Sequence, residues 1–207
     1  MPQFDDAAHF WDGRYAEDNY LFGTEPNAFL AREGWRLPGR GHALAVADGE
    51  GRNGVWLAQQ GLDVISIDIS ARGVEKAKAL AAARGVTLDL RLADITTFDM
   101  GEGAFDAVVA IFIQFAPPGT REELFARMVR ALKPGGLLFL QGYRPEQVDY
   151  GTGGPPQREH MYTMDLLHAQ FGQLEWLHSD SYDARMREGS GHDGLSALIE
   201  LVARKPA

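Results

Sequence analysis

The sequence has no cysteine among its 207 residues. This absence excludes a disulfide framework, a thiolate metal site and any mechanism that needs a cysteine nucleophile. Long apolar runs are also missing, since no stretch approaches the ~18 residues that a membrane-spanning helix needs. Residues 1–6 are acidic and lack the basic and apolar regions of a signal peptide. We therefore expect a soluble, cytoplasmic protein.

Positive charge is scarce as well. The chain has 20 Lys and Arg against 29 Asp and Glu, a formal net charge of −9, and no run of five basic residues. Nucleic-acid binding takes most of its affinity from Lys and Arg that neutralise phosphates, so this balance disfavours a nucleic-acid partner. No cluster of His, Asp and Glu has metal-ligand spacing. We expect no membrane, nucleic-acid or metal partner.

The composition is otherwise that of a globular chain, with 45% hydrophobic and 24% charged residues. At this length one core buries about 70% of the unfolded surface, so residues 1–207 are expected to form a single domain. Apolar runs alternate with helix-patterned segments, which predicts an α/β fold around a parallel, doubly wound sheet. The strands are expected at 43–47, 63–68, 86–92, 105–113, 137–141, 174–182 and 195–204.

The most informative stretch is the glycine-rich turn between the first two of these strands. Gly49 and Gly51 lack Cβ atoms, so the backbone can turn sharply after the first strand and approach a ligand closely. Asp68 lies at the tip of the second strand, where a carboxylate can accept both hydroxyls of a ribose. The stretch therefore predicts a βαβ unit that binds a nucleoside.

The residues around the glycines bear on which nucleoside is bound. Residues 49–54 match the G-x-G-x-x-G pattern of dinucleotide-binding turns, which suggests NAD. Asp48 and Glu50, however, would place two carboxylates beside a pyrophosphate that needs N–H donors and positive potential. S-adenosylmethionine carries a sulfonium and an ammonium and no phosphate, so an acidic turn favours it. A turn whose glycines serve only packing remains the structural alternative.

Ligands of open parallel sheets lie across the carboxyl ends of the strands. The site should therefore extend to Asp94, which is either a turn residue or an acceptor for an adenine amino group covered by Ile95. It should also reach Phe112, at the end of the fourth strand.

The N-terminal segment, residues 1–34, is rich in aromatic side chains. One interpretation is an aromatic helix that packs on the sheet; the other is a lid over the nucleoside site. The residues expected to serve the lid or contact the substrate are Trp11, Arg14, Tyr15 and Tyr20. In this division, residues 43–142 form the cofactor-binding core, and residues 143–207 supply a substrate-side loop and the last strands.

Taken together, these motifs resemble the class I S-adenosylmethionine-dependent methyltransferases, in particular bacterial members similar to the tellurite-resistance and thiopurine methyltransferases. The resemblance implies a single Rossmann-like, mostly parallel sheet of seven strands whose last strand is antiparallel. It implies S-adenosylmethionine as the cofactor and S-adenosylhomocysteine as the product. The motifs that carry it are 11–30, 49–53, Asp68, Asp94, 105–106, 132–136 and 201–205.

The resemblance also assigns the parts of the cofactor: the methionine part to Gly49 and Gly51, the ribose to Asp68, and adenine to Asp94 with Ile95. The full set expected at the cofactor is Asp48, Gly49, Glu50, Gly51, Asn53, Asp68, Ile69, Asp94, Ile95, Ile111 and Phe112.

The chain departs from the family at Ala45 and Ala47, where the family usually has an acidic residue and its first glycine. Asp48 or Glu50 would then hold the cofactor's ammonium instead.

The methyl acceptor is expected to be a small molecule. Amino-methylating nucleic-acid enzymes carry an Asn- or Asp-Pro-Pro-aromatic run after the fourth strand, whereas residues 111–114 here read Ile-Phe-Ile-Gln. His160 and His192 lie in expected loops at the carboxyl edge and are the candidate catalytic residues. The alternatives are an NAD-dependent oxidoreductase and a non-catalytic S-adenosylmethionine-binding protein. The oligomeric state is left open between monomer and homodimer.

Overall fold

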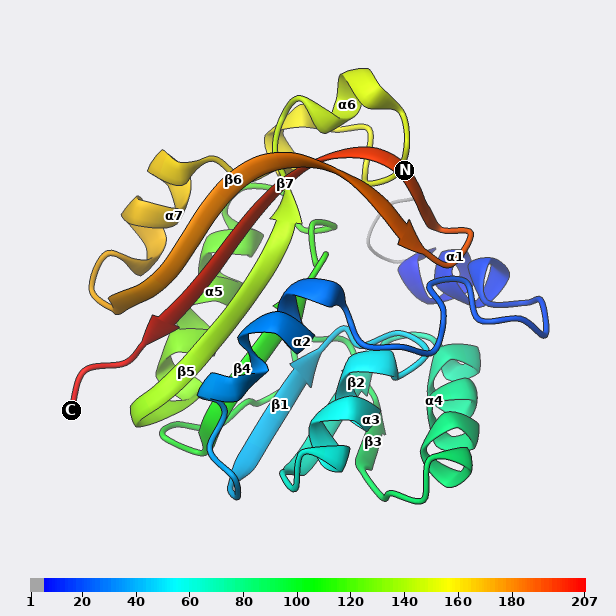
Figure 1. Cartoon of the computed structure of the whole chain (residues 1–207), viewed down its shortest axis with the longest axis horizontal. Coiled ribbons are helices and arrows are strands. Elements are labelled where there is room, and N and C mark those ends of the chain that lie inside the picture. The colour runs from blue at the N-terminus through cyan, green and yellow to red at the C-terminus, as the bar shows by residue number, and fades with distance from the viewer. Residues whose placement is uncertain (1–5) are drawn as a thin grey trace.

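The computed structural model describes residues 6–207, so residues 1–5 of the expected N-terminal segment lie outside it. Its centre is a seven-stranded sheet of order β3-β2-β1-β4-β5-β7-β6 (Figure 1). β7 pairs antiparallel with both neighbours, and the other pairings are parallel. The predicted α/β fold with an antiparallel last strand is therefore confirmed. The strands are β1 His42–Val46, β2 Asp63–Asp68, β3 Asp89–Leu92, β4 Phe105–Ile111, β5 Leu132–Tyr143, β6 Glu175–Glu188 and β7 His192–Arg204.

Helices cover both faces of the sheet (Figure 1). α2 and α3 pack on one face through Phe29, Leu30 and Leu57, and α5 and α7 pack on the other through Phe125 and Phe171. Successive residues of β1 enter these two layers alternately, which explains why that strand is apolar throughout. Among the described residues, no helix is long and apolar enough to cross a membrane. The helices are α1 Ala7–Arg14, α2 Ala28–Glu33, η2 Gly34–Arg36, α3 Arg52–Gln59, α4 Ala71–Ala83, α5 Thr120–Ala131, α6 Gln147–Tyr150, η3 Arg158–His160 and α7 Met164–Phe171.

Three helices begin at a capping side chain. Asn27 Oδ1 accepts a hydrogen bond from Leu30 N at 3.1 Å, Ser70 Oγ accepts one from Gly73 N at 3.0 Å, and Thr163 Oγ1 accepts one from Leu166 N at 3.2 Å. Each cap satisfies an N–H group that has no partner inside the helix. The cap at Ser70 also fixes the chain directly after Asp68, at the edge of the sheet where the ligand is expected.

The β6–β7 hairpin is longer than the sequence predicts. The strands expected at 174–182 and 195–204 continue until Glu188 pairs with His192, so the prediction that His192 lies in a loop is wrong. The hairpin arches across the carboxyl edge toward α1 (Figure 1), where Gly191 N donates to Leu21 O at 2.9 Å. The extra residues of β6 and β7 are mostly polar, so their side chains do not show a strand pattern in the sequence. They form strands because each backbone pairs with the backbone of the other strand.

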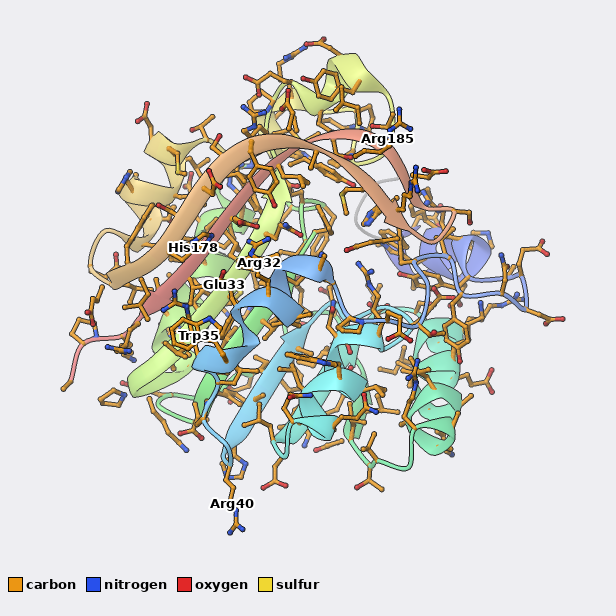
Figure 2. The ribbon with its side chains drawn as sticks, viewed as in Figure 1. Arg32, Glu33, Trp35, Arg40, His178 and Arg185 are labelled. Carbon is orange, nitrogen blue, oxygen red and sulfur yellow. The ribbon has the colours of Figure 1, made fainter. Side chains whose placement is uncertain are left out.

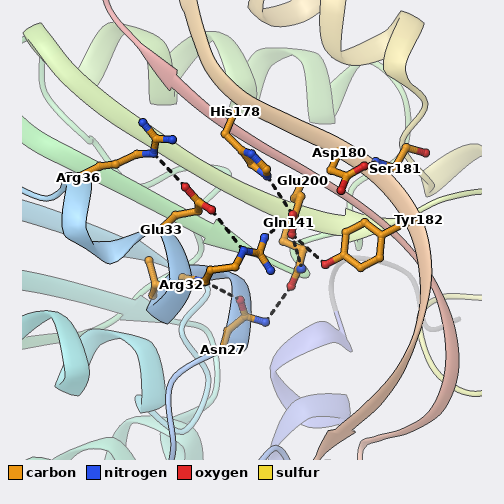
Figure 3. Close-up of polar contacts among 11 residues, drawn as sticks. Asn27, Arg32, Glu33, Arg36, Gln141, His178, Asp180, Ser181, Tyr182 and Glu200 are labelled. Carbon is orange, nitrogen blue, oxygen red and sulfur yellow. Dashed lines mark hydrogen bonds and ion pairs between the residues drawn. The ribbon is translucent and has the colours of Figure 1, made fainter.

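A polar cluster around one buried carboxylate ties α2 to the sheet (Figures 2 and 3). We call it the Glu200 cluster. The Glu200 carboxylate, on β7, is 1% exposed. It accepts hydrogen bonds from Arg32, from Gln141 Nε2 at 3.2 Å and from the Tyr182 hydroxyl at 3.1 Å, and it lies 3.0 Å from His178 Nε2. A buried charge with this many partners fixes the position of α2 over β5 and β7.

Candidate functional site

A cavity of about 440 Å³ opens at the carboxyl edge of the sheet, between α1, the strand ends and the tip of the β6–β7 hairpin. Most of the site residues that the sequence predicts line it: Trp11, Arg14, Tyr15, Asp48, Gly49, Asn53, Asp68, Ile69, Asp94, Ile95, Ile111, Phe112 and His192. The cavity therefore brings together side chains from the expected lid, cofactor and substrate groups. Four predicted residues lie outside the lining: Tyr20, Glu50, Gly51 and His160.

The backbone at the cavity is unusual at the ends of two adjacent strands. Ala47 after β1 and Phe112 after β4 both adopt positive φ, 48° and 56°, although neither is glycine. Such conformations are costly for residues with a side chain and concentrate at functional sites. Gly49 also has positive φ, and a Cβ there would lie 2.6 Å from the Tyr15 hydroxyl. Gly49 therefore permits close approach of the N-terminal segment as well as the sharp turn.

Asp68 lines the cavity beside the glycine turn, and backbone N–H groups hold its carboxylate in place. Its carboxylate accepts hydrogen bonds from Gly49 N at 2.7 Å and Ser70 N at 2.9 Å. Burial raises the pKa of Asp68 to about 6, against the opposing effect of these hydrogen bonds. The carboxylate is thus held in one orientation at the end of β2, with its charge poorly compensated by solvent.

Asp48 is the second carboxylate at this end. It accepts hydrogen bonds from Ser66 Oγ at 2.8 Å and Gly54 N at 3.0 Å, which fixes the first turn of α3. Burial raises the pKa of Asp48 to about 7. Two carboxylates whose ionisation burial opposes would be stabilised by a cationic ligand and destabilised by a phosphate. These two buried carboxylates therefore fit S-adenosylmethionine better than NAD.

Glu50 does not line the cavity, because its carboxylate is engaged elsewhere. Its carboxylate accepts hydrogen bonds from Leu21 N and Lys76 Nζ, both at 2.8 Å. Lys76 belongs to α4, and Tyr20 contacts the same helix, since its hydroxyl donates to Lys76 O at 3.1 Å. Both residues fasten the N-terminal segment to the glycine turn and α4. Of the two carboxylates proposed from the sequence for the cofactor's ammonium, only Asp48 lines the cavity.

Asp94 and Asn53 also line the cavity. Asp94 accepts hydrogen bonds from Thr96 N at 2.8 Å and Thr96 Oγ1 at 2.7 Å, which closes a turn after β3. Asn53 Oδ1 accepts one from Asn27 N at 2.9 Å. Asp94 is therefore a turn residue, as one interpretation of the sequence holds, and it also faces the space where the adenine is expected.

The end of the cavity at His192 is aromatic. The His192 ring lies 4.4 Å from the Phe22 ring and 4.5 Å from the Phe112 ring, and the Phe112 and Tyr143 rings are 4.6 Å apart, centre to centre. Burial lowers the pKa of His192 below its usual 6.5 and raises that of Tyr143. His192 Nδ1 and the Tyr143 hydroxyl are buried without a hydrogen-bond partner among the residues described. The Glu188 carboxylate is the charged group that faces His192 Nδ1, 3.8 Å away. The unpaired Tyr143 hydroxyl indicates where a polar group of a ligand would be stabilised.

His160, the competing histidine, is buried at the end of η3. Between it and β5 lies Gln114, whose Nε2 donates to Tyr143 O at 2.8 Å and approaches His160 O at 3.4 Å. The structure therefore brings the backbone of His160, rather than its imidazole, toward this end of the site.

The N-terminal segment divides into two parts. α1 has no buried residue, and its Trp11 stacks on Tyr15 with ring centres 5.4 Å apart. α2, in contrast, places Phe29 and Leu30 in the core, both at most 1% exposed. The two interpretations of this segment, cavity cover and core helix, therefore apply to different helices.

Sequence reasoning missed several residues that line the cavity. They share no local pattern, and most come from loops or from helix and strand ends: Ala7, Phe10, Phe22, Ala47, Arg52, Gln114, Phe115, Tyr143, Gly153, Gly154, Pro155, Pro156 and Gly191. The signal that was available is the long glycine- and proline-rich loop at 151–156, which is typical of a functional cover.

The sheet order, the glycine turn and the acidic cavity end define a class I S-adenosylmethionine-dependent methyltransferase fold. Residues 43–136 match the family described as a methyltransferase domain. This match to a methyltransferase domain, together with the shared fold, confirms the resemblance found in the sequence to the class I S-adenosylmethionine-dependent methyltransferases.

Three relatives illustrate the match. The chain is 24% identical to a thiopurine S-methyltransferase of Legionella pneumophila, over 95% of this chain and 96% of that protein. It is 29% identical to the 2-heptyl-1-hydroxyquinolin-4(1H)-one methyltransferase of Mycobacteroides abscessus, over 53% and 51%. Among solved structures, the N-methyltransferase NodS of Bradyrhizobium japonicum, in complex with S-adenosylhomocysteine, has a TM-score of 0.71 at 17% identity and covers 98% of this chain and 100% of its own. The first curated relatives, at 32% identity, are matched over only 34% of their own length.

Proposed function

We propose that the chain transfers the methyl group of S-adenosylmethionine to an uncharged small-molecule acceptor. The observation that carries this proposal is one cavity lined both by carboxylates at the glycine turn and by aromatic rings around His192. S-adenosylmethionine, when bound, supplies a methyl group on a sulfonium, and the electron pair of the broken S–C bond stays on sulfur. Alignment of the two reactants and exclusion of water can lower the barrier by about 7 to 11 kcal/mol in favourable cases.

At the acidic end, the residues of the chain would hold the cofactor by hydrogen bonds and charge. Asp68 would accept the ribose hydroxyls, and Asp94 with Ile95 would hold adenine. Asp48 would offer its carboxylate to the ammonium, since it lines the cavity and carries a raised pKa. α1 would cover the bound cofactor and limit the access of water.

At the aromatic end, the chemistry favours a flat, uncharged acceptor. Among the described residues, two guanidiniums line the cavity, and neither is free for an anionic acceptor. Arg52 is paired with Glu188 at 2.7 Å and donates to Phe22 O at 3.1 Å, and Arg14 lies over the Trp11 ring, 5.7 Å from its centre. Aromatic rings and prolines offer stacking surface rather than charge. Two relatives are named for heteroaromatic acceptors, a thiopurine and a hydroxyquinolinone, and this supports the same class here.

Calorimetric titration with S-adenosylmethionine, S-adenosylhomocysteine and NAD tests the cofactor. We expect the first two to bind and NAD to give no heat; NAD binding would favour the oxidoreductase.

Release of labelled methyl product tests turnover. The panel should include a heteroaromatic thiol, a phenol, an aliphatic amine and an oxyanion, and we expect product from the first two. Binding of S-adenosylmethionine without product from any acceptor would favour a non-catalytic binding protein.

A further inference from the structure

Glu188 and His192 face each other at the closed end of the β6–β7 hairpin. They form the last cross-strand pair, and Glu188 Oε2 lies 3.8 Å from His192 Nδ1. The turn between them is attached to the N-terminal segment, since Gly191 N donates to Leu21 O. The pair therefore has a fixed position at the rim of the cavity.

The Glu188 carboxylate is strongly held as an anion. It receives hydrogen bonds from Arg52 Nη2 at 2.7 Å, Ala28 N at 3.0 Å and Asn27 Nδ2 at 3.2 Å. Burial opposes ionisation, yet the interactions with His192, Arg52 and Ala28 N outweigh it and lower the pKa of Glu188 to about 2. Glu188 thus stays charged at every pH at which the protein would work.

The His192 ring is held between Phe22 and Phe112. Nδ1 is buried and lies on the side of the Glu188 carboxylate. A lone pair on Nδ1 would be repelled by this anion, whereas an N–H on Nδ1 would be attracted to it. The opposite edge of the ring carries Nε2 and Cδ2, and Cδ2 lies 3.8 Å from the Cβ position at Gly153, which lines the cavity. The anion and the cavity are therefore on opposite edges of the imidazole.

We propose that Glu188 is a positioning residue that holds His192 as its Nδ1–H tautomer, so that the Nε2 lone pair faces the methyl acceptor. This inference rests on the proposed function. As the acceptor's X–H bond breaks, its electron pair forms the X–CH₃ bond and Nε2 takes the proton, later passing it to water. Glu188 stabilises the imidazolium that forms, and it does not itself take the proton.

The other charged and titratable groups around His192 either disfavour its protonation or have no charge to favour it. Arg52 on α3 and Arg14 on α1 both disfavour the imidazolium, as does burial. Tyr143 on β5 contributes a neutral ring edge. Glu188 is the anion that favours protonation of His192, so its removal has a predictable direction.

Nitrogen NMR of the histidine side chains tests the tautomer in the unmodified protein. The His192 signal is identified by its loss in His192→Gln. We expect Nδ1 to be protonated and Nε2 to be unprotonated above the pKa of His192. The opposite tautomer would overturn the proposal, and no turnover is needed for this measurement, so it stands apart from a failure of the proposed function.

The variant Glu188→Gln tests the electrostatic part. Loss of an anion at this distance should lower the pKa of His192 by about one unit or more. It should also move the acidic limb of the turnover profile, measured with the aromatic thiol or phenol that gives product, to lower pH by the same amount. A folded variant with an unchanged His192 pKa would contradict the proposal.

The control is Glu175→Gln. Glu175 is also a glutamate of this hairpin, but it lies at the other end of β6, where its exposed carboxylate pairs with Arg204 at 3.3 Å. We expect its removal to leave the His192 tautomer and pKa unchanged. An equal shift in both variants would assign the effect to general loosening of the hairpin.

Discussion

The two ends of the cavity differ in chemistry and in how the chain builds them. The acidic end takes Asp48, Asp68 and its turn from one continuous βαβ unit, residues 42–68, and stabilises both carboxylates through backbone N–H groups. The aromatic end collects Phe22, Phe112, Tyr143 and His192 from four separate segments. An end that is encoded locally suits a cofactor shared by many enzymes, and an end that is assembled from distant segments can vary with the acceptor.

The largest expected effect is on turnover at the aromatic end. His192→Gln should lower the turnover rate by about 100-fold or more, because a positioned general base contributes about 10² to 10⁴. Cofactor affinity, measured by calorimetry, should barely change. His160→Gln is the matched control and should retain full turnover. The reverse result would move the acceptor contact to the loop after β5.

At the acidic end, Asp68→Ala should weaken S-adenosylmethionine binding at least about tenfold. Hydrogen bonds to a charged group contribute about 1.5 to 3 kcal/mol each, and one such bond corresponds to this factor. The control is Asp63→Ala, at the opposite end of the same strand, where the side chain is 86% exposed. Unchanged affinity in a folded Asp68 variant would remove that residue from the site.

Deletion of residues 1–14 separates the cover from the core. Because α1 buries no side chain, the sheet should stay folded, with a nearly unchanged melting temperature and a several-fold loss of cofactor affinity. The comparison is Phe29→Ala in α2, which should cost about 3 to 5 kcal/mol of stability in denaturant unfolding. A deletion that unfolds the protein would assign α1 to the core.

The smallest effect is a graded pH dependence of cofactor affinity. Burial places the pKa values of Asp48 and Asp68 at about 7 and about 6 in the free protein. A bound cation favours the ionised carboxylates, so binding below these values must release protons. Affinity measured by calorimetry should therefore rise as the pH increases through about 5 to 7 and then level off. Asp48→Asn should flatten the upper part of this rise.

The same difference between the two ends explains how much the sequence could reveal. The sequence predicts the sites of Gly49, Asp68 and Asp94 because each of these residues closely follows or ends a strand that the local pattern identifies. The orientation of Glu50 is not readable, since it depends on Lys76 and on Leu21 N, which only the folded chain brings close. Tyr143 reaches the cavity because β5 extends two residues beyond the expected 137–141.

The N-terminal segment and the hairpin give the complementary lesson. The aromatic content of residues 1–34 predicts that a surface is covered, but it does not separate the core residues of α2 from the cover formed by α1. His192 enters the site because β6 and β7 keep pairing past the point where their side chains look like a loop. In both cases tertiary contacts, rather than local preference, decide the outcome.

The position of β7 has a consequence for how the protein is made. The strand lies between β5 and β6, although it follows both in the chain. During synthesis, one edge of β5 therefore stays unpaired until residues 192–204 leave the ribosome. An unpaired strand edge can pair with another chain and start aggregation. The βαβ unit emerges much earlier, so a nascent chain would gain its nucleoside-binding turn well before it acquires His192.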